Sequence, residues 1–186
     1  MTQKKGEDSM PPKARFTRDR IEEAAYQLAK EKGFEAIAAR EVAKSLGMTV
    51  TPIFTYFSGM EELKTAVRDR VRREFEACLR GSLEYFPAFK EFGARWMGYA
   101  AENPNFYRLL VASGDPLGSV DDLLYLIRDT IDPITREIAD TFAISKKDAR
   151  DILRHMVIYA NGLCSFLMQE SCTMTVEELS DSSSQV

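Results

Sequence analysis

Apolar residues recur at helical spacing along the chain, beginning just after Thr17. Their three- and four-residue intervals place them on one side of a helix, and the first such stripe consists of Ile21, Ala24, Ala25 and Leu28. Thr17 has the side chain of a typical N-cap, and Gly33 stands where a helix C-cap is expected. We therefore predict a first helix between these two residues.

The same spacing, interrupted by Pro and Gly breaks, predicts further helices over about residues 39–46, 49–56, 60–83, 88–101, 105–112, 120–142 and 146–170. Ser58 and Glu61 form a capping-box pair before the long helix at 60–83, and Ser145 and Asp148 form another before the last helix. Pro133 is expected to bend or split the helix that contains it. Because no segment shows strand-length alternation between hairpin turns, the predicted fold class is all-α.

The first three helices have the layout of a helix-turn-helix, with the tight turn at Gly47-Met48-Thr49 between the second and the third. Hydroxyl groups gather on the outer side of the third helix, which carries Thr49, Thr51, Pro52, Thr55 and Tyr56. Such side chains hydrogen-bond to phosphates and base edges, so this face is a candidate DNA contact. The alternative is an apolar helix in a small bundle without a nucleic-acid partner.

The opposite side of the third helix is expected to form the core of this bundle. Its inward residues are predicted to be Ile53, Phe54 and Phe57, packed on Ile21, Leu28, Val42 and Leu46.

Several spaced segments of this region resemble the TetR family of bacterial transcriptional regulators, over about residues 15–65. The matching segments are Thr17 to Ala25, Gly33-Phe34, Val42 to Thr49, Ile53 to Phe57, and Glu61-Glu62-Leu63. The resemblance implies a homodimer with two DNA-reading heads and a C-terminal effector domain. It also implies that Thr49, Thr51, Pro52, Thr55 and Tyr56 lie on the DNA face.

The chain departs from the family pattern at three positions. Ala38 stands where the family usually has a Thr or Ser cap, Met60 replaces a usual Lys, and Phe54 replaces a usual Tyr. Each change removes a group that the family uses toward phosphate, and fewer phosphate contacts lower DNA affinity. The expected substitutes are Arg40, Lys64 and the arm residues Lys13, Arg15 and Arg18.

The C-terminal two thirds of the chain are rich in large apolar side chains, for which packing in the core is the simplest interpretation. Helices joined by Pro- and Gly-marked breaks also enclose apolar cavities with a few polar groups. The residues predicted to line such a ligand site are Trp96, Tyr99, Phe106, Tyr107, Tyr125, Arg128 and Tyr159. For Arg128, a surface arginine is the favoured interpretation, and an anchor for an anionic ligand is the alternative.

The last helix carries a broad apolar face that nothing later in the chain can cover. Its predicted dimer-interface residues are Met156, Leu163, Phe166 and Leu167. A two-fold dimer is the commonest arrangement for such a face, and closure of the monomer's own bundle is the alternative.

Charge is divided unevenly along the chain. Residues 1–80 hold sixteen Lys and Arg against thirteen Asp and Glu, a net of +3, whereas the remainder holds nine against sixteen, a net of −7. A basic front on an acidic body indicates that the front meets a polyanion. With one histidine, three cysteines and no phosphate-binding glycine loop, the sequence predicts no metal site, no cofactor and no enzyme activity.

No apolar run is long enough to cross a bilayer, and the first residues contain no apolar signal segment, so a cytoplasmic protein is expected. We divide the chain into a flexible arm at 1–15, a helix-turn-helix domain at 16–59, a helical effector-binding and dimerisation domain at 60–172, and a polar tail at 173–186.

These observations predict a dimeric transcriptional regulator that binds a palindromic double-stranded DNA operator. We expect a repressor that a small hydrophobic ligand releases from its operator. The alternative is a helical protein that is regulated by a protein partner, or that stays on DNA without any small-molecule effector.

Overall fold

The computed structural model describes residues 16–111, 124 and 127–168, and every regular element in these ranges is a helix. This confirms the all-α class. The elements are α1 (Arg18–Lys32), η1 (Phe34–Ala36), α2 (Ala39–Ser45), α3 (Thr51–Tyr56), α4 (Met60–Arg80), η2 (Gly81–Glu84), α5 (Ala88–Glu102), α6 (Pro104–Val111), α8 (Arg128–Phe142) and α9 (Lys146–Leu167). The expected arm, the polar tail and the segment that contains Tyr125 lie outside the described residues.

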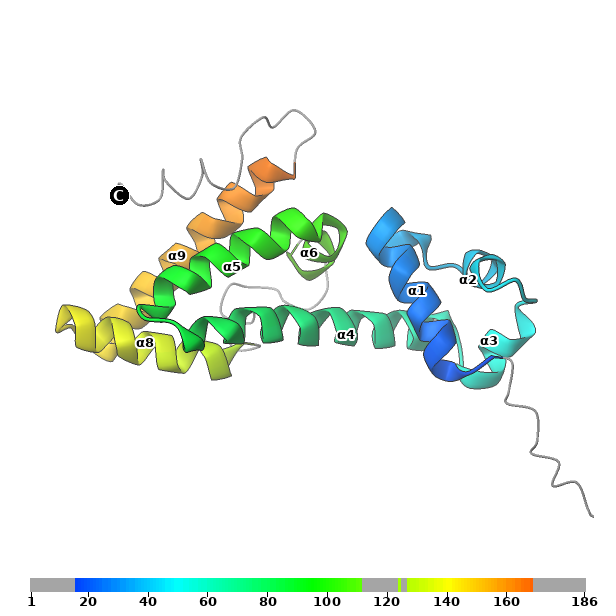
Figure 1. Cartoon of the computed structure of the whole chain (residues 1–186), viewed down its shortest axis with the longest axis horizontal. Helices are drawn as coiled ribbons and strands as arrows, with labels where there is room; N and C mark the ends of the chain where they lie inside the picture. The colour runs from blue at the N-terminus through cyan, green and yellow to red at the C-terminus, as the bar shows by residue number, and fades with distance from the viewer. Residues whose placement is uncertain (1–15, 112–123, 125–126, 169–186) are drawn as a thin grey trace, which may run out of the picture.

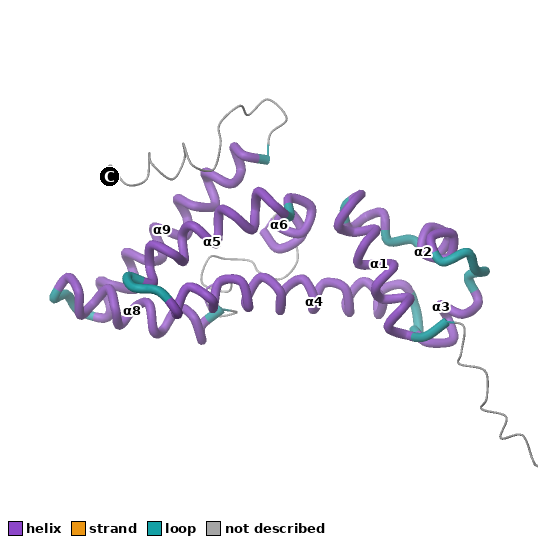
Figure 2. The backbone as a smooth tube through the Cα atoms, viewed as in Figure 1, coloured by secondary structure: helices purple, strands orange, loops and turns teal. Residues whose placement is uncertain are grey.

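The long helix α4 runs along the molecule and joins two groups of helices (Figure 1). The head, α1 to α3, lies around the N-terminal part of α4, and the body, α5 with α8 and α9, lies at its C-terminal part. Figure 2 shows α6 at the end of α5 that faces α1, so the body approaches the head at a second place beside α4. None of the described helices is long and apolar enough to span a membrane.

The predicted limits of the first helix are confirmed. The Thr17 side chain accepts a hydrogen bond from the backbone N–H of Arg20, and Gly33 ends the helix with a φ of 87°. A positive φ is costly for a residue with a Cβ atom, which explains a glycine at this position. In contrast, α3 begins at Thr51 rather than at Thr49, with Pro52 in its first turn.

The predicted cap of the long helix is wrong in its detail. Gly59 occupies the N-cap position, and the backbone N–H of Ser58 donates to Oε2 of Glu62, 2.7 Å away, instead of pairing with Glu61. At the start of α9 the capping pair is confirmed, because the backbone N–H of Asp148 donates to Oγ of Ser145 at 3.1 Å.

The helix α8 continues through Pro133 from Arg128 to Phe142, so proline does not split it. Proline removes one backbone donor within a helix, and the intact turns on either side retain their own hydrogen bonds. The predicted beginning of this helix at residue 120 lies outside the described residues, and α9 ends at Leu167, three residues before the predicted end.

One side of α4 is buried along its whole length. The residues at successive four-residue intervals, Leu63, Val67, Val71, Phe75 and Leu79, are all fully buried. The first of them pack with the head and the last with the body, in one continuous apolar cluster. This shared helix fixes the position of the head relative to the body.

Candidate functional site

Two buried side chains attach the short helix α3 to the rest of the head. Ile53 and Phe57 are fully buried, as predicted. Phe54 is not: half of its surface is exposed, so its predicted inward position is wrong. Residues 53 and 57 lie four apart on one helix face, whereas residue 54 is rotated about 100° away from Ile53 and toward solvent.

The outward side of α3 carries the predicted hydroxyls. Thr49, Thr51 and Thr55 are exposed, and Pro52 is half-buried between them. The Thr55 hydroxyl donates to the backbone oxygen of Thr51 at 3.2 Å, which leaves the oxygen lone pairs of Thr55 available as acceptors. These side chains lie together on the surface of the head.

Tyr56 has a role within the head that the sequence analysis missed. Its hydroxyl donates to the backbone oxygen of Phe16 at 2.8 Å, and its own backbone oxygen accepts from Nη1 of Arg18 at 2.6 Å. Arg18 also forms an ion pair with Glu62 at 2.9 Å. These contacts join the start of α1, the end of α3 and the start of α4.

Two of the expected phosphate contacts, Arg40 and Lys64, differ in their exposure. Arg40 is exposed on α2, whereas Lys64 is half-buried on α4 with its Nζ 5.8 Å from the centre of the Phe34 ring. Ala38 provides no side-chain cap for α2. Arg40 is therefore the more accessible of the two cations.

A polar cluster connects α1 of the head to the shared helix α4. The Tyr26 hydroxyl donates to Oε2 of Glu74 at 2.6 Å, and Arg70 donates to Oε1 of the same carboxylate at 3.0 Å and to Glu23 at 2.6 Å. Burial, followed by the Glu74 hydrogen bond, raises the pKa of Tyr26 to about 12. This cluster could not be predicted from the sequence, because its α1 residues lie more than 40 residues from its α4 residues along the chain.

Helix α6 adds a second connection to α1. The Asn105 side chain donates to the backbone oxygen of Lys30 at 2.9 Å, and the rings of Phe106 and Tyr26 lie 4.8 Å apart. Phe106, a predicted ligand residue, therefore packs against the head.

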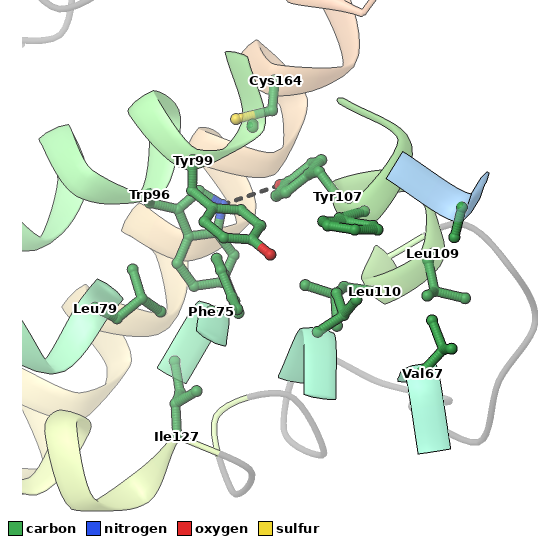
Figure 3. Packing of buried hydrophobic residues seen from close by; sticks show 14 of the residues in the cluster. Val67, Phe75, Leu79, Trp96, Tyr99, Tyr107, Leu109, Leu110, Ile127 and Cys164 are labelled. Carbon is green, nitrogen blue, oxygen red and sulfur yellow. Dashed lines mark hydrogen bonds between the residues drawn. The ribbon is translucent and has the colours of Figure 1, made fainter. Parts of the chain in front are cut away.

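Other predicted ligand residues meet at the centre of the body (Figure 3). Trp96 and Tyr107 are fully buried, and Nε1 of Trp96 donates to the Tyr107 hydroxyl at 2.9 Å. The Tyr107 hydroxyl in turn donates to Oδ1 of Asn161 on α9. The Phe75 ring lies 5.1 Å from Trp96 and 4.9 Å from Tyr99.

Not every predicted ligand residue belongs to this group. Arg128 and Tyr159 are exposed, and Tyr125 lies outside the described residues. Two hollows of the described surface also lie elsewhere: one of about 350 Å³ between α1 and the end of α2, and one of about 480 Å³ between α8 and the start of α9.

Three buried hydroxyls in the body have no hydrogen-bond partner within the described structure. They belong to Tyr99, Ser82 and Thr130. Burial raises the pKa of Tyr99 above its ordinary value, so the phenol remains a neutral donor. Buried polar groups normally find partners, so these three hydroxyls are unusual among the described residues.

The outer side of α9 exposes large apolar residues at seven-residue intervals. Ile152, Tyr159 and Phe166 all lie on it, and Phe166 is 58% exposed. Met156 and Leu163, predicted at the dimer interface, are half-buried beside this stripe. The Leu167 side chain lies outside the described part of the chain.

The geometry defines a protein with a helix-turn-helix head on a helical body. Residues 21–67 match the family described as "Bacterial regulatory proteins, tetR family", within the region where the sequence shows its resemblance. A curated relative, the "HTH-type transcriptional repressor DrrR1" of Streptomyces coeruleorubidus, is 40% identical over 68 residues, which is 37% of this chain. The chain spans about a quarter of the length of that relative.

Solved structures share the fold beyond the head. A putative transcriptional regulator from Pseudomonas aeruginosa PAO1 has a TM-score of 0.67 at 18% identity, over 90% of this chain and 86% of that one. A tetR-family regulator from Streptomyces coelicolor has a TM-score of 0.62 at 14% identity, over 89% and 75% of the two chains. The head and the body together therefore have the fold of these regulators.

Proposed function

We propose that this protein is a DNA-binding transcriptional regulator that represses its target genes and leaves its operator when a small hydrophobic ligand binds. The observation that supports it best is the recognition helix α3, held by buried Ile53 and Phe57, with Thr51 and Thr55 exposed inside a tetR-family segment. Such a protein acts where bacterial DNA lies, in the cytoplasm.

Two heads are needed for this activity, and the exposed stripe of α9 supports a homodimer. Ile152, Tyr159 and Phe166 offer a self-complementary apolar face that a two-fold axis would bury. A two-fold dimer binds a palindromic operator, with half-sites about 10 bp or a multiple of that apart.

The shared helix α4 supports coupling between ligand and DNA. The head packs on its first half and the aromatic group around Trp96 on its second half. A ligand that enters beside Trp96 and pairs with the unsatisfied Tyr99 hydroxyl would favour a shifted position of α4. The population of dimers with both heads in register with the operator would then fall.

The DNA-binding part of the proposal is tested by selecting bound sequences from a random pool of duplexes. We expect a palindromic motif, and recovery of no motif would refute DNA recognition. Tyr56→Ala should weaken binding to the selected operator by about 1–3 kcal/mol. Tyr56→Phe keeps the ring and loses only the hydroxyl bonded to Phe16, so it shows how much of that effect comes from the hydroxyl and how much from the ring, with circular dichroism as the check on folding.

The ligand-binding part is tested with Trp96, the single tryptophan, as the fluorescent reporter. A hydrophobic effector should change its emission, raise the melting temperature and weaken operator binding, and the operator should weaken ligand binding by the same factor. Trp96→Leu should lower ligand affinity more than stability. If a broad set of lipophilic compounds changes neither fluorescence nor melting, regulation by a protein partner or constitutive binding is favoured instead.

A further inference from the structure

The exposed side of α3 contains an apolar group that the sequence analysis assigned to the core. Phe54 is 50% exposed and Val50 is 37% exposed. The two residues are four apart in helical backbone, so their side chains lie on the same side of the helix. We call Val50 and Phe54 the apolar pair of α3.

The apolar pair lies beside the candidate DNA contacts. Thr51 and Thr55 each follow a member of the pair along the chain and are exposed as well. Because the Thr55 hydroxyl is bonded to the backbone oxygen of Thr51, its methyl group is held away from that bond. The outward surface of α3 therefore presents carbon atoms together with hydroxyl oxygens.

This surface carries no charged side chain. Between Lys44 and Glu61 the sequence contains no Asp, Glu, Lys or Arg. A carboxylate here would be repelled by phosphates, and a cation would be drawn to phosphates or to guanine. Their absence leaves hydrogen bonds from the threonines and apolar contact from Phe54 and Val50 as the means of recognising bases.

The aromatic ring of Phe54 is half exposed although Ile53 beside it is fully buried. The ring has no hydrogen-bonding atom of its own. In the major groove of DNA the matching apolar group is the C5 methyl of thymine.

We propose that the apolar pair of α3 contacts thymine C5 methyl groups in each half-site, so that Phe54 determines specificity for thymine at one operator position. The inference rests on the proposed function, since it requires that α3 enters the major groove. It adds a base preference to that function and assigns it to Phe54, which stands where the TetR family usually has Tyr.

The test replaces thymine by uracil, one position at a time, in the operator recovered from the random pool. Uracil keeps the base-pairing atoms and removes only the methyl group. Wild type should lose about fourfold in affinity per contacted methyl, the amount expected for one buried carbon group. Phe54→Ala should bind the thymine operator more weakly and should no longer distinguish thymine from uracil at the position that Phe54 contacts.

Matched variants isolate the effect. Phe54→Leu, which keeps an apolar side chain, should retain part of the discrimination, and Tyr85→Ala, at an exposed tyrosine of the body, should retain all of it. Equal binding of thymine and uracil operators by wild type, or unchanged discrimination in folded Phe54→Ala, would overturn this inference and leave DNA binding intact. Failure to recover any operator would overturn the proposed function and the inference together.

Discussion

The buried hydroxyl of Tyr107 allows a sharp test of the interior of the body. It accepts a hydrogen bond from Nε1 of Trp96 and donates one to Oδ1 of Asn161, linking α5, α6 and α9. Tyr107→Phe keeps the ring and removes only this oxygen. Trp96 is fully buried, so its N–H would lose its acceptor without gaining water.

A buried donor without a partner costs about 1–3 kcal/mol. For a chain of this size, that corresponds to a melting temperature lower by roughly 2–12 °C. Asn161 is half-buried and can exchange its lost partner for water, so Asn161→Ala should cost less than Tyr107→Phe. Tyr85→Phe, at an exposed tyrosine outside α9, is the control and should change stability by less than about 0.5 kcal/mol.

The assay is urea unfolding followed both by Trp96 fluorescence and by circular dichroism. Coincident transitions license the use of a single free energy of unfolding. Wild-type stability in Tyr107→Phe, or a larger loss in Asn161→Ala than in Tyr107→Phe, would refute the reasoning, because the hydroxyl would then not be the required partner of the indole.

Further predictions concern pH and assembly. Hydrogen bonds from Ser58, followed by that from Arg18, lower the pKa of Glu62 to about 2. The stability from this carboxylate is therefore full above pH 4.5 and lost as pH falls toward 2, so the stability difference between wild type and Glu62→Gln should vanish over that range in urea unfolding. Phe166→Asp should sediment as a monomer or aggregate instead of a dimer, because it places an unpaired charge in the α9 interface. The control Phe86→Asp changes an 85% exposed residue away from α9 and should sediment as wild type does. A dimeric Phe166→Asp would argue against the α9 interface.

Local signals predicted the helices well, because caps act within one turn. Thr17 and Gly33 mark the ends of α1 through contacts three or four residues away, which the sequence displays directly. The wrong prediction for Ser58 also concerns neighbouring residues, since Glu61 and Glu62 are adjacent. The backbone direction at Gly59, where the chain enters α4, decides which of the two accepts from Ser58.

Side-chain burial was harder to predict in short helices, because a few residues show too little of the helical period. The six residues of α3 contain Ile53, Phe54 and Phe57, and two inward residues suffice to anchor so short a helix. The hydrophobicity of Phe54 favoured burial, but its angular position decided exposure. The partners of Tyr26 and Trp96 were also out of reach, since Glu74 and Tyr107 meet them only after distant helices pack.

The continuous buried face of α4 has a consequence for how the chain unfolds. Leu63 and Val67 complete the interior around α1, and Phe75 and Leu79 complete the interior around α5, yet all four belong to one helix. The first three helices cut off at Gly59 would lose that support and expose Ile53 and Phe57, which α3 needs as anchors. Head and body therefore behave as one cooperative unit that melts in a single transition, although the family match covers only its first part.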